Sequence, residues 1–135
     1  MINTKRMLVA WIVVVVATFI YDWLVFGILL EPIHEAHPGI LRPQAELPML
    51  RMFLSSALAW ALVTLLYVLF ARGRASRLST GIVFGVLMGF ICGWIPQVFN
   101  KMLLVNWPFY LSWAPAGFFE FLLAGVILGL IYREQ

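Results

Sequence analysis

Charged residues are scarce in this sequence. Only 11% of its 135 residues are charged and 64% are hydrophobic, whereas roughly a quarter of the residues in a soluble domain are charged. So few charges cannot cover a globule in water, and the composition therefore predicts an integral membrane protein that is surrounded by the lipid bilayer. The formal net charge of +3 is small, so nothing in the composition indicates a nucleic-acid partner.

Cysteine is almost absent, and catalytic motifs are missing. The single Cys92 excludes an intrachain disulfide and leaves the redox compartment open. The sequence has no glycine-rich phosphate loop and no nucleophile elbow, and Ser55 and Ser56 have no histidine near them in the sequence. We therefore predict a protein that is not an enzyme, and the sequence requires no cofactor.

Four long apolar segments dominate the chain. They cover about residues 7–30, 49–71, 78–99 and 115–132, close to the roughly 20 residues that a helix needs to cross the hydrocarbon core. The first segment lacks the short apolar region and the cleavage motif of a signal peptide, so we expect it to be retained. The sequence thus predicts an all-α fold, a four-helix membrane bundle in a single domain over residues 1–135.

The basic residues predict an orientation. Most of them fall at the two ends of the chain or in the second connection: Lys5, Arg6, Arg72, Arg74, Arg77 and Arg133. Only three fall on the other side, namely Arg42 and Lys101 in the other connections and Arg51 at the start of the second span. Because positive charge favours the cytoplasmic side, we expect both termini in the cytoplasm and the connections 31–48 and 100–114 outside. A bacterial inner membrane is the default location.

A glycine repeat distinguishes the third span. Its glycines recur every fourth residue, and the fourth span contributes two more to the predicted packing set: Gly81, Gly85, Gly89, Gly93, Gly125 and Gly129. A helix with glycines four apart presents a ridge without side chains, which lets a neighbouring helix approach closely in lipid. The contact can lie within one chain or between chains. This feature favours a non-catalytic accessory or structural subunit of a membrane complex or homo-oligomer.

Two carboxyl groups lie inside spans, those of Asp22 and Glu120. A charge deep in the bilayer costs about 2.5 to 3.5 kcal/mol, so such residues normally face a bundle interior or a wet cavity. In the expected topology both lie in the outer half of the membrane. The alternative function is therefore an outward-facing binding or transport protein for a cation, a proton or a lipid-like small molecule. A structural role, with each acid paired or hydrogen-bonded, is the competing interpretation.

The binding hypothesis draws its pocket from all four spans. Its members are Asp22, Glu120, Gln97, Lys101, Arg51, Trp23, Trp94 and Trp107. Pro96 supports a pocket at this level, because a proline inside a helix displaces the carbonyl four residues earlier, here that of Cys92. We expect a kink there to splay the outer end of the third span.

The first connection contains a possible metal motif, His34-Glu-Ala-His37. Two histidines three residues apart share a helical face, and imidazole is a ligand for zinc or iron. The motif lacks the His-Glu-x-x-His spacing of a metalloprotease. Solvated surface histidines remain the other interpretation of His34 and His37.

Overall fold

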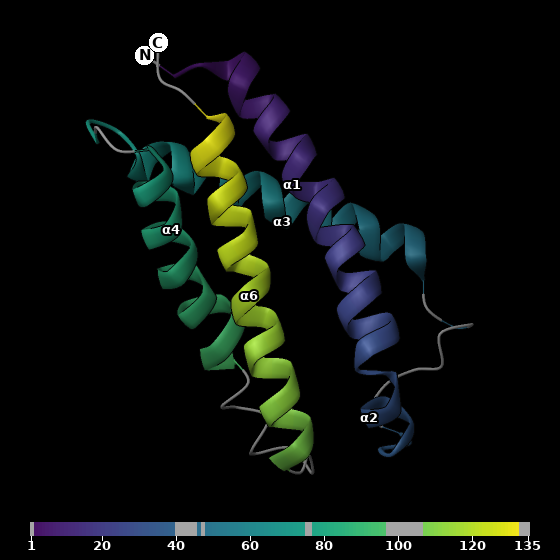
Figure 1. Ribbon diagram of the computed structural model, residues 1–135. Helices are drawn as coiled ribbons and strands as arrows, with labels where there is room; N and C mark the ends of the chain where they lie inside the picture. Colours follow the sequence, from purple (N-terminus) through teal and green to yellow (C-terminus); the bar gives the residue numbers. More distant parts are fainter. Residues whose placement is uncertain (1, 40–45, 47, 75–76, 97–106, 133–135) are drawn as a thin grey trace.

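The computed structural model describes residues 2–39, 46, 48–74, 77–96 and 107–132. Four long helices make up the fold (Figure 1). They are α1 (Thr4–Leu24) with the π-helical segment η1 (Val25–Leu29), α3 (Met49–Phe70), α4 (Arg77–Met88) with the π-helical segment η3 (Gly89–Trp94), and α6 (Trp107–Ile131). A short helix, α2 (Glu31–Glu35), follows η1.

All four helices are long and apolar enough to span a membrane. The candidate spans are Thr4–Leu29, Met49–Phe70, Arg77–Trp94 and Phe109–Ile131, so the prediction of an all-α four-span membrane protein is confirmed. The fourth helix starts earlier than the sequence predicts. It begins at Trp107 and carries Pro115 in its interior, because Phe109, Tyr110 and Ala114 are buried and hold this segment helical against its neighbours.

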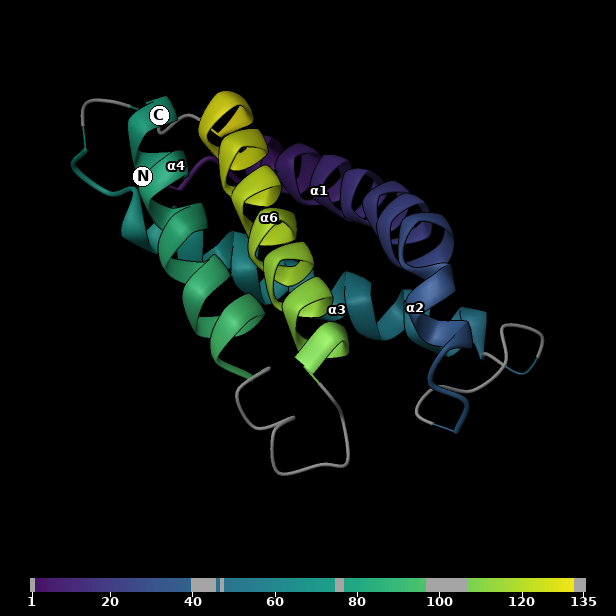
Figure 2. The same cartoon turned by 60° about the horizontal axis from the view of Figure 1, so that its bottom comes forward.

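The helices are arranged around α6. Both views show α6 between α1 and α4, with α3 crossing behind them obliquely (Figures 1 and 2). The start of α1 and the end of α6 lie at one end of the molecule, and α2 lies at the other. The guanidinium of Arg6 donates to the carbonyl of Ile131 at 3.5 Å, which ties those two helix ends together.

The buried core lies at the end where α1 begins. Its most buried large side chains come from the middle of α1 and α4 and from near the end of α3 and α6: Val14, Tyr67, Val68, Phe84 and Leu128. Nearer the start of α1, the indole of Trp11 donates to the carbonyl of Ala57 on α3 at 2.9 Å. The bundle is therefore tightly packed at one end, which leaves the other end to form a cavity.

The glycine ridge packs against α6 of the same chain. A Cβ placed on Gly81 would meet the Gly125 carbonyl oxygen, and one on Gly93 would lie 2.6 Å from the Gly117 carbonyl oxygen. Gly85, Gly89 and Gly129 also abut backbone of the facing helix, at 2.8 to 2.9 Å. Backbone contact of this kind requires residues without side chains. Of the two possibilities left open by the sequence, the structure thus uses the glycine contact within the chain.

Two helices widen into π turns where a proline follows. The amide of Leu30 donates to the carbonyl of Val25, and that of Ile95 to the carbonyl of Phe90, each five residues back. Pro32 and Pro96 come shortly after these turns. Because a proline displaces the carbonyl four residues earlier, here those of Ile28 and Cys92, we interpret each wide turn as the local response to its proline. The distortion expected from Pro96 thus takes the form of a π turn.

Candidate functional site

A cavity opens between the helices at the end that carries α2. Its volume is about 1360 Å³, and residues of α1, η1, α2, α3, η3 and α6 line it. Both π segments contribute to its wall, η1 through Phe26 and Gly27 and η3 through Cys92 and Gly93. π turns in otherwise regular helices frequently mark functional sites, so we take this cavity as the candidate site.

Asp22 and Glu120 line the same cavity from opposite helices. Asp22 belongs to α1 and Glu120 to α6, both are partly buried, and they lie within electrostatic range of each other. The phenol of Tyr21 donates to the carbonyl of Ala116 at 2.8 Å, and Ala116 lies one helical turn before Glu120. This hydrogen bond fixes α1 to α6 beside both acids. The structure therefore brings together the two carboxyl groups that the sequence placed in different spans.

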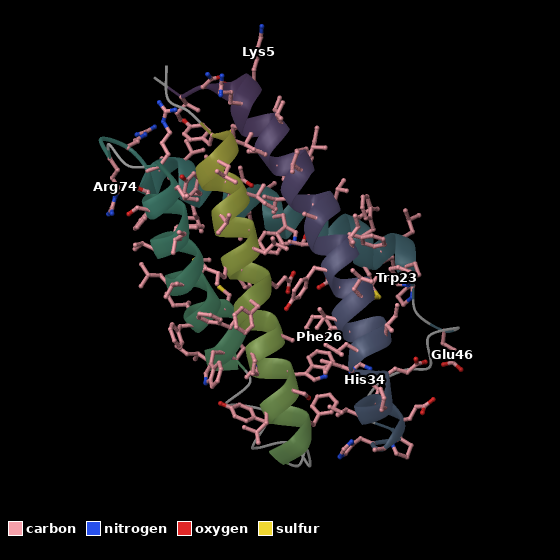
Figure 3. All side chains as sticks on the ribbon, viewed as in Figure 1. Lys5, Trp23, Phe26, His34, Glu46 and Arg74 are labelled. Carbon is pink, nitrogen blue, oxygen red and sulfur yellow. The ribbon has the colours of Figure 1, made fainter. Side chains whose placement is uncertain are left out.

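The cavity is rich in acidic side chains, and histidines are the only basic residues in its described lining. Its four carboxyl groups belong to Asp22, Glu31, Glu35 and Glu120. No lysine or arginine contributes to the wall over the ranges that the structure describes. Lys5 and Arg74 lie at the opposite end of the molecule from His34 (Figure 3). The site thus has an excess of acidic groups, which favours a positively charged occupant.

Aromatic rings form much of the remaining wall. Phe26 and Trp113 line the cavity with their rings 4.8 Å apart, and Phe109, outside the lining, stacks on Trp113 at 5.1 Å with an interplanar angle of 15°. Phe26 of η1 and His34 of α2 lie on the side that faces α6 (Figure 3). Phe121 of α6 also lines the cavity and lies 5.0 Å from Trp60 of α3. Aromatic faces attract cations, so the walls and the carboxyl groups favour the same kind of ligand.

His34 joins α2 to α6 at the edge of this aromatic group. The indole Nε1–H of Trp113 donates to His34 Nε2 at 3.0 Å. An indole nitrogen can only donate, so His34 is neutral with its proton on Nδ1. Burial lowers the pKa of His34, and the neighbouring Glu31 opposes this effect in part. Both influences act on a side chain that forms part of the cavity wall.

The two histidines do not assemble a metal site in the described part of the chain. His34 Nε2 is occupied by Trp113, and His37 Nδ1 lies 2.7 Å from the Ile33 carbonyl, to which it donates. Nowhere among the described residues do three or more His, Cys, Asp or Glu side chains converge as metal ligands. Both imidazoles instead lie against Phe109, at 6.0 Å.

The other members of the predicted pocket are placed differently. Trp23 lines the cavity, but Arg51 is exposed on α3 and does not. Trp94 lies 6.3 Å from Phe90 and 6.4 Å from Tyr110, outside the cavity lining. Trp94 lies elsewhere because the π turn of η3 presents Cys92 and Gly93 to the cavity instead. Gln97, Lys101 and the side chain of Trp107 lie outside the described residues.

Sequence reasoning missed the contribution of α2 and of the start of α6. Glu31, His34 and Glu35 fall in a segment that we expected to be a loop, and Trp113 in one that we expected to be a connection. The signal that was available is Pro32, since α2 carries this proline in its first turn, a favoured position at a helix start.

Comparison with known proteins adds no family to this description. No protein-family model matches the chain, and neither the curated proteins nor the solved structures include a significant match to it. The chain is a four-span helical membrane protein with an acidic, aromatic-walled cavity at one end of the bundle.

Proposed function

We propose that this protein binds a lipophilic organic cation in the cavity, with Asp22 and Glu120 as its charged contacts. The single observation that carries the proposal is that two carboxyl groups from the first and last spans line one cavity, with no lysine or arginine in its described lining. Intramembrane acids are costly and normally serve a ligand or an ion. The site has no assigned catalytic group, and we propose no reaction.

The aromatic wall favours an organic cation over a bare metal ion. The rings of Phe26, Trp113 and Phe121 border the space beside the acids, and cation–π attraction grows when the cation is desolvated. A volume of about 1360 Å³ is large for a single ion, and ligand pockets for drug-sized molecules are about 300 to 1,000 Å³. A cation with apolar substituents fills a space of this volume and also suits its aromatic wall.

Orientation and location belong to the proposal. The basic residues at the start of α1 and around the α3–α4 connection favour placing that end in the cytoplasm, which puts the cavity on the outer side. A bacterial inner membrane remains the expected location. The cavity then receives its ligand from outside or from the outer leaflet, and transport to the other side requires a second conformation in which the packed core opens.

A function as an accessory or structural subunit of a membrane complex has less support than ligand binding. Its main argument was the glycine face, and that face is occupied by α6 of the same chain. A homo-oligomer or a larger complex would therefore use other surfaces. The apolar face of α3 is one such surface, with Leu50, Leu54 and Leu58 exposed, although lipid alone also covers such faces.

Equilibrium binding of tetraphenylphosphonium to the detergent-purified protein tests the proposal. Its anionic counterpart of the same shape, tetraphenylborate, is the matched probe. At an effective dielectric constant of about 20, a unit charge roughly 6 Å away contributes about 3 kcal/mol. Part of this is offset by desolvation, so we expect Glu120→Gln to weaken binding by about tenfold or more. Micelles that contain the protein should bind no more tetraphenylborate than empty micelles do.

Glu46→Gln is the matched control variant. Glu46 is exposed and is not among the residues that line the cavity, so the same change there should leave the affinity unchanged. Equal affinity for the cation and the anion, or equal losses in Glu120→Gln and Glu46→Gln, would remove the acids from any binding role.

A further inference from the structure

The helix α2 covers one side of the cavity, and we call it the strap. It follows the π turn η1, packs against η1 and α6, and contributes Glu31, His34 and Glu35 to the wall. Its polar link to α6 is the hydrogen bond from Trp113 Nε1 to His34 Nε2, at 3.0 Å. Around this bond the contacts are between rings, with Phe109 lying 6.0 Å from His34. The hydrogen bond that joins α2 to α6 in the described part of the chain therefore has a titratable acceptor.

Protonation of His34 removes this acceptor. Both ring nitrogens of an imidazolium carry protons, so Nε2–H would then face the indole N–H at 3.0 Å, with two donors opposed and no acceptor between them. On its own side of the cavity the imidazolium has a partner, because Glu31 interacts with it electrostatically. The protonated ring thus gains by turning from Trp113 toward Glu31.

The carboxyl groups on the α2 side favour the same movement. On the α2 side these are Glu31, Glu35 and His37, of which the carboxylates attract an imidazolium on the strap itself. The segment η1 contains no ionisable residue. On α6 the ionisable residues of the described range are Tyr110 and Glu120, and the cavity also holds Asp22 of α1.

We infer that the Trp113–His34 hydrogen bond holds α2 closed over the cavity, and that protonation of His34 releases it and opens the cavity at acidic pH. The inference rests on the proposed function, since it assigns a regulation to the same ligand site. Because burial lowers the pKa of His34, the neutral, closed form prevails at neutral pH. Opening occurs as the pH falls below the usual range of a histidine.

A distance measurement between α2 and α6 tests the inference without any ligand. Spin labels are attached at Ala36→Cys and Leu111→Cys in the full chain with Cys92→Ser, since Ala36 and Leu111 are exposed. Double electron–electron resonance is then recorded at about pH 7.5 and about pH 5, on either side of an ordinary histidine pKa. We expect a single short distance at the higher pH and loss of most of that population at the lower pH.

Two variants identify the group responsible. His34→Gln keeps a side-chain acceptor for Trp113 but does not titrate, so the short distance should persist at both pH values. Trp113→Phe keeps an aromatic ring but has no donor, so the long distance should appear at both. Opening of His34→Gln at low pH, or a short distance in Trp113→Phe, would overturn the inference. The helical signal in circular dichroism shows that each variant is folded.

The binding experiment separates this inference from the proposed function. If the distance changes as expected and tetraphenylphosphonium does not bind at either pH, the proposed function fails and the closure by His34 stands. If the cation binds and the distance stays fixed between the two pH values, the ligand site stands and the closure fails.

Discussion

Replacing Gly85 by alanine should lower the stability of the bundle, because the added methyl group would collide with the backbone of α6. A Cβ at position 85 would lie 2.9 Å from the Phe121 carbonyl oxygen and 3.0 Å from the Leu122 Cα. Both are backbone atoms, so neither can rotate away. Carbon contacts are optimal at about 3.5 to 4.0 Å, and the two helices must therefore separate by roughly 0.6 Å.

That separation weakens the whole interface. A gap of about 0.5 to 1 Å forfeits a quarter to a half of the dispersion attraction between facing atoms, and overpacking of a tight site costs about 1 to 3 kcal/mol. We expect a loss within this range for Gly85→Ala. The loss should be larger for Gly81→Ala and Gly93→Ala, whose Cβ atoms would approach the facing backbone more closely.

Unfolding by sodium dodecyl sulfate, followed by circular dichroism, measures this loss. Val83→Ile is the matched control, because it adds one methyl group on the same helix at a side chain that is 44% exposed. The control should unfold at the wild-type detergent fraction. Alanine variants as stable as Val83→Ile would show that α4 and α6 do not meet along the glycines.

Three further predictions concern the cavity. Tyr21→Phe removes the hydrogen bond to Ala116 and should cost about 1 kcal/mol in the same titration; an unchanged midpoint would show that this bond does not hold α1 to α6. Glu120→Gln should stabilise the protein by about 1 kcal/mol while it weakens cation binding, because it removes a desolvated charge near Asp22; a less stable variant would indicate a structural acid. Thermal stability should fall as the pH drops below 6.5, the ordinary pKa of a histidine, because burial lowers the pKa of His34 and the unfolded chain therefore binds the proton first. His34→Gln should lose that part of the dependence of stability on pH. An unaltered pH dependence in this variant would assign it to another group.

The sequence was sufficient for the span architecture. Apolar length predicts four membrane helices, and the fourfold spacing of Gly81 to Gly93 predicts a close helix contact that the structure places against α6. It also suggested a shared level for Asp22 and Glu120, because both lie near the same predicted surface. These inferences depend on length and spacing, which are local properties that a single sequence records directly.

The wall of the site depends on tertiary contacts and could not be predicted. Nothing in the spacing of His34 and Trp113 indicates that they meet, since 79 positions separate them. Phe109 resembles an interfacial aromatic until its burial is known. The π turns η1 and η3 arise from prolines in the chain, yet whether a proline ends, kinks or widens a helix depends on the neighbouring helices.

The account depends most on the two acids acting at one site. A double-mutant cycle with Asp22→Asn, Glu120→Gln and the combined variant, read out as tetraphenylphosphonium affinity, tests this directly. We predict that each single variant weakens binding and that the double variant loses clearly less than the sum of the two losses in binding free energy. Additive losses, or affinity that either variant leaves intact, would contradict a shared site.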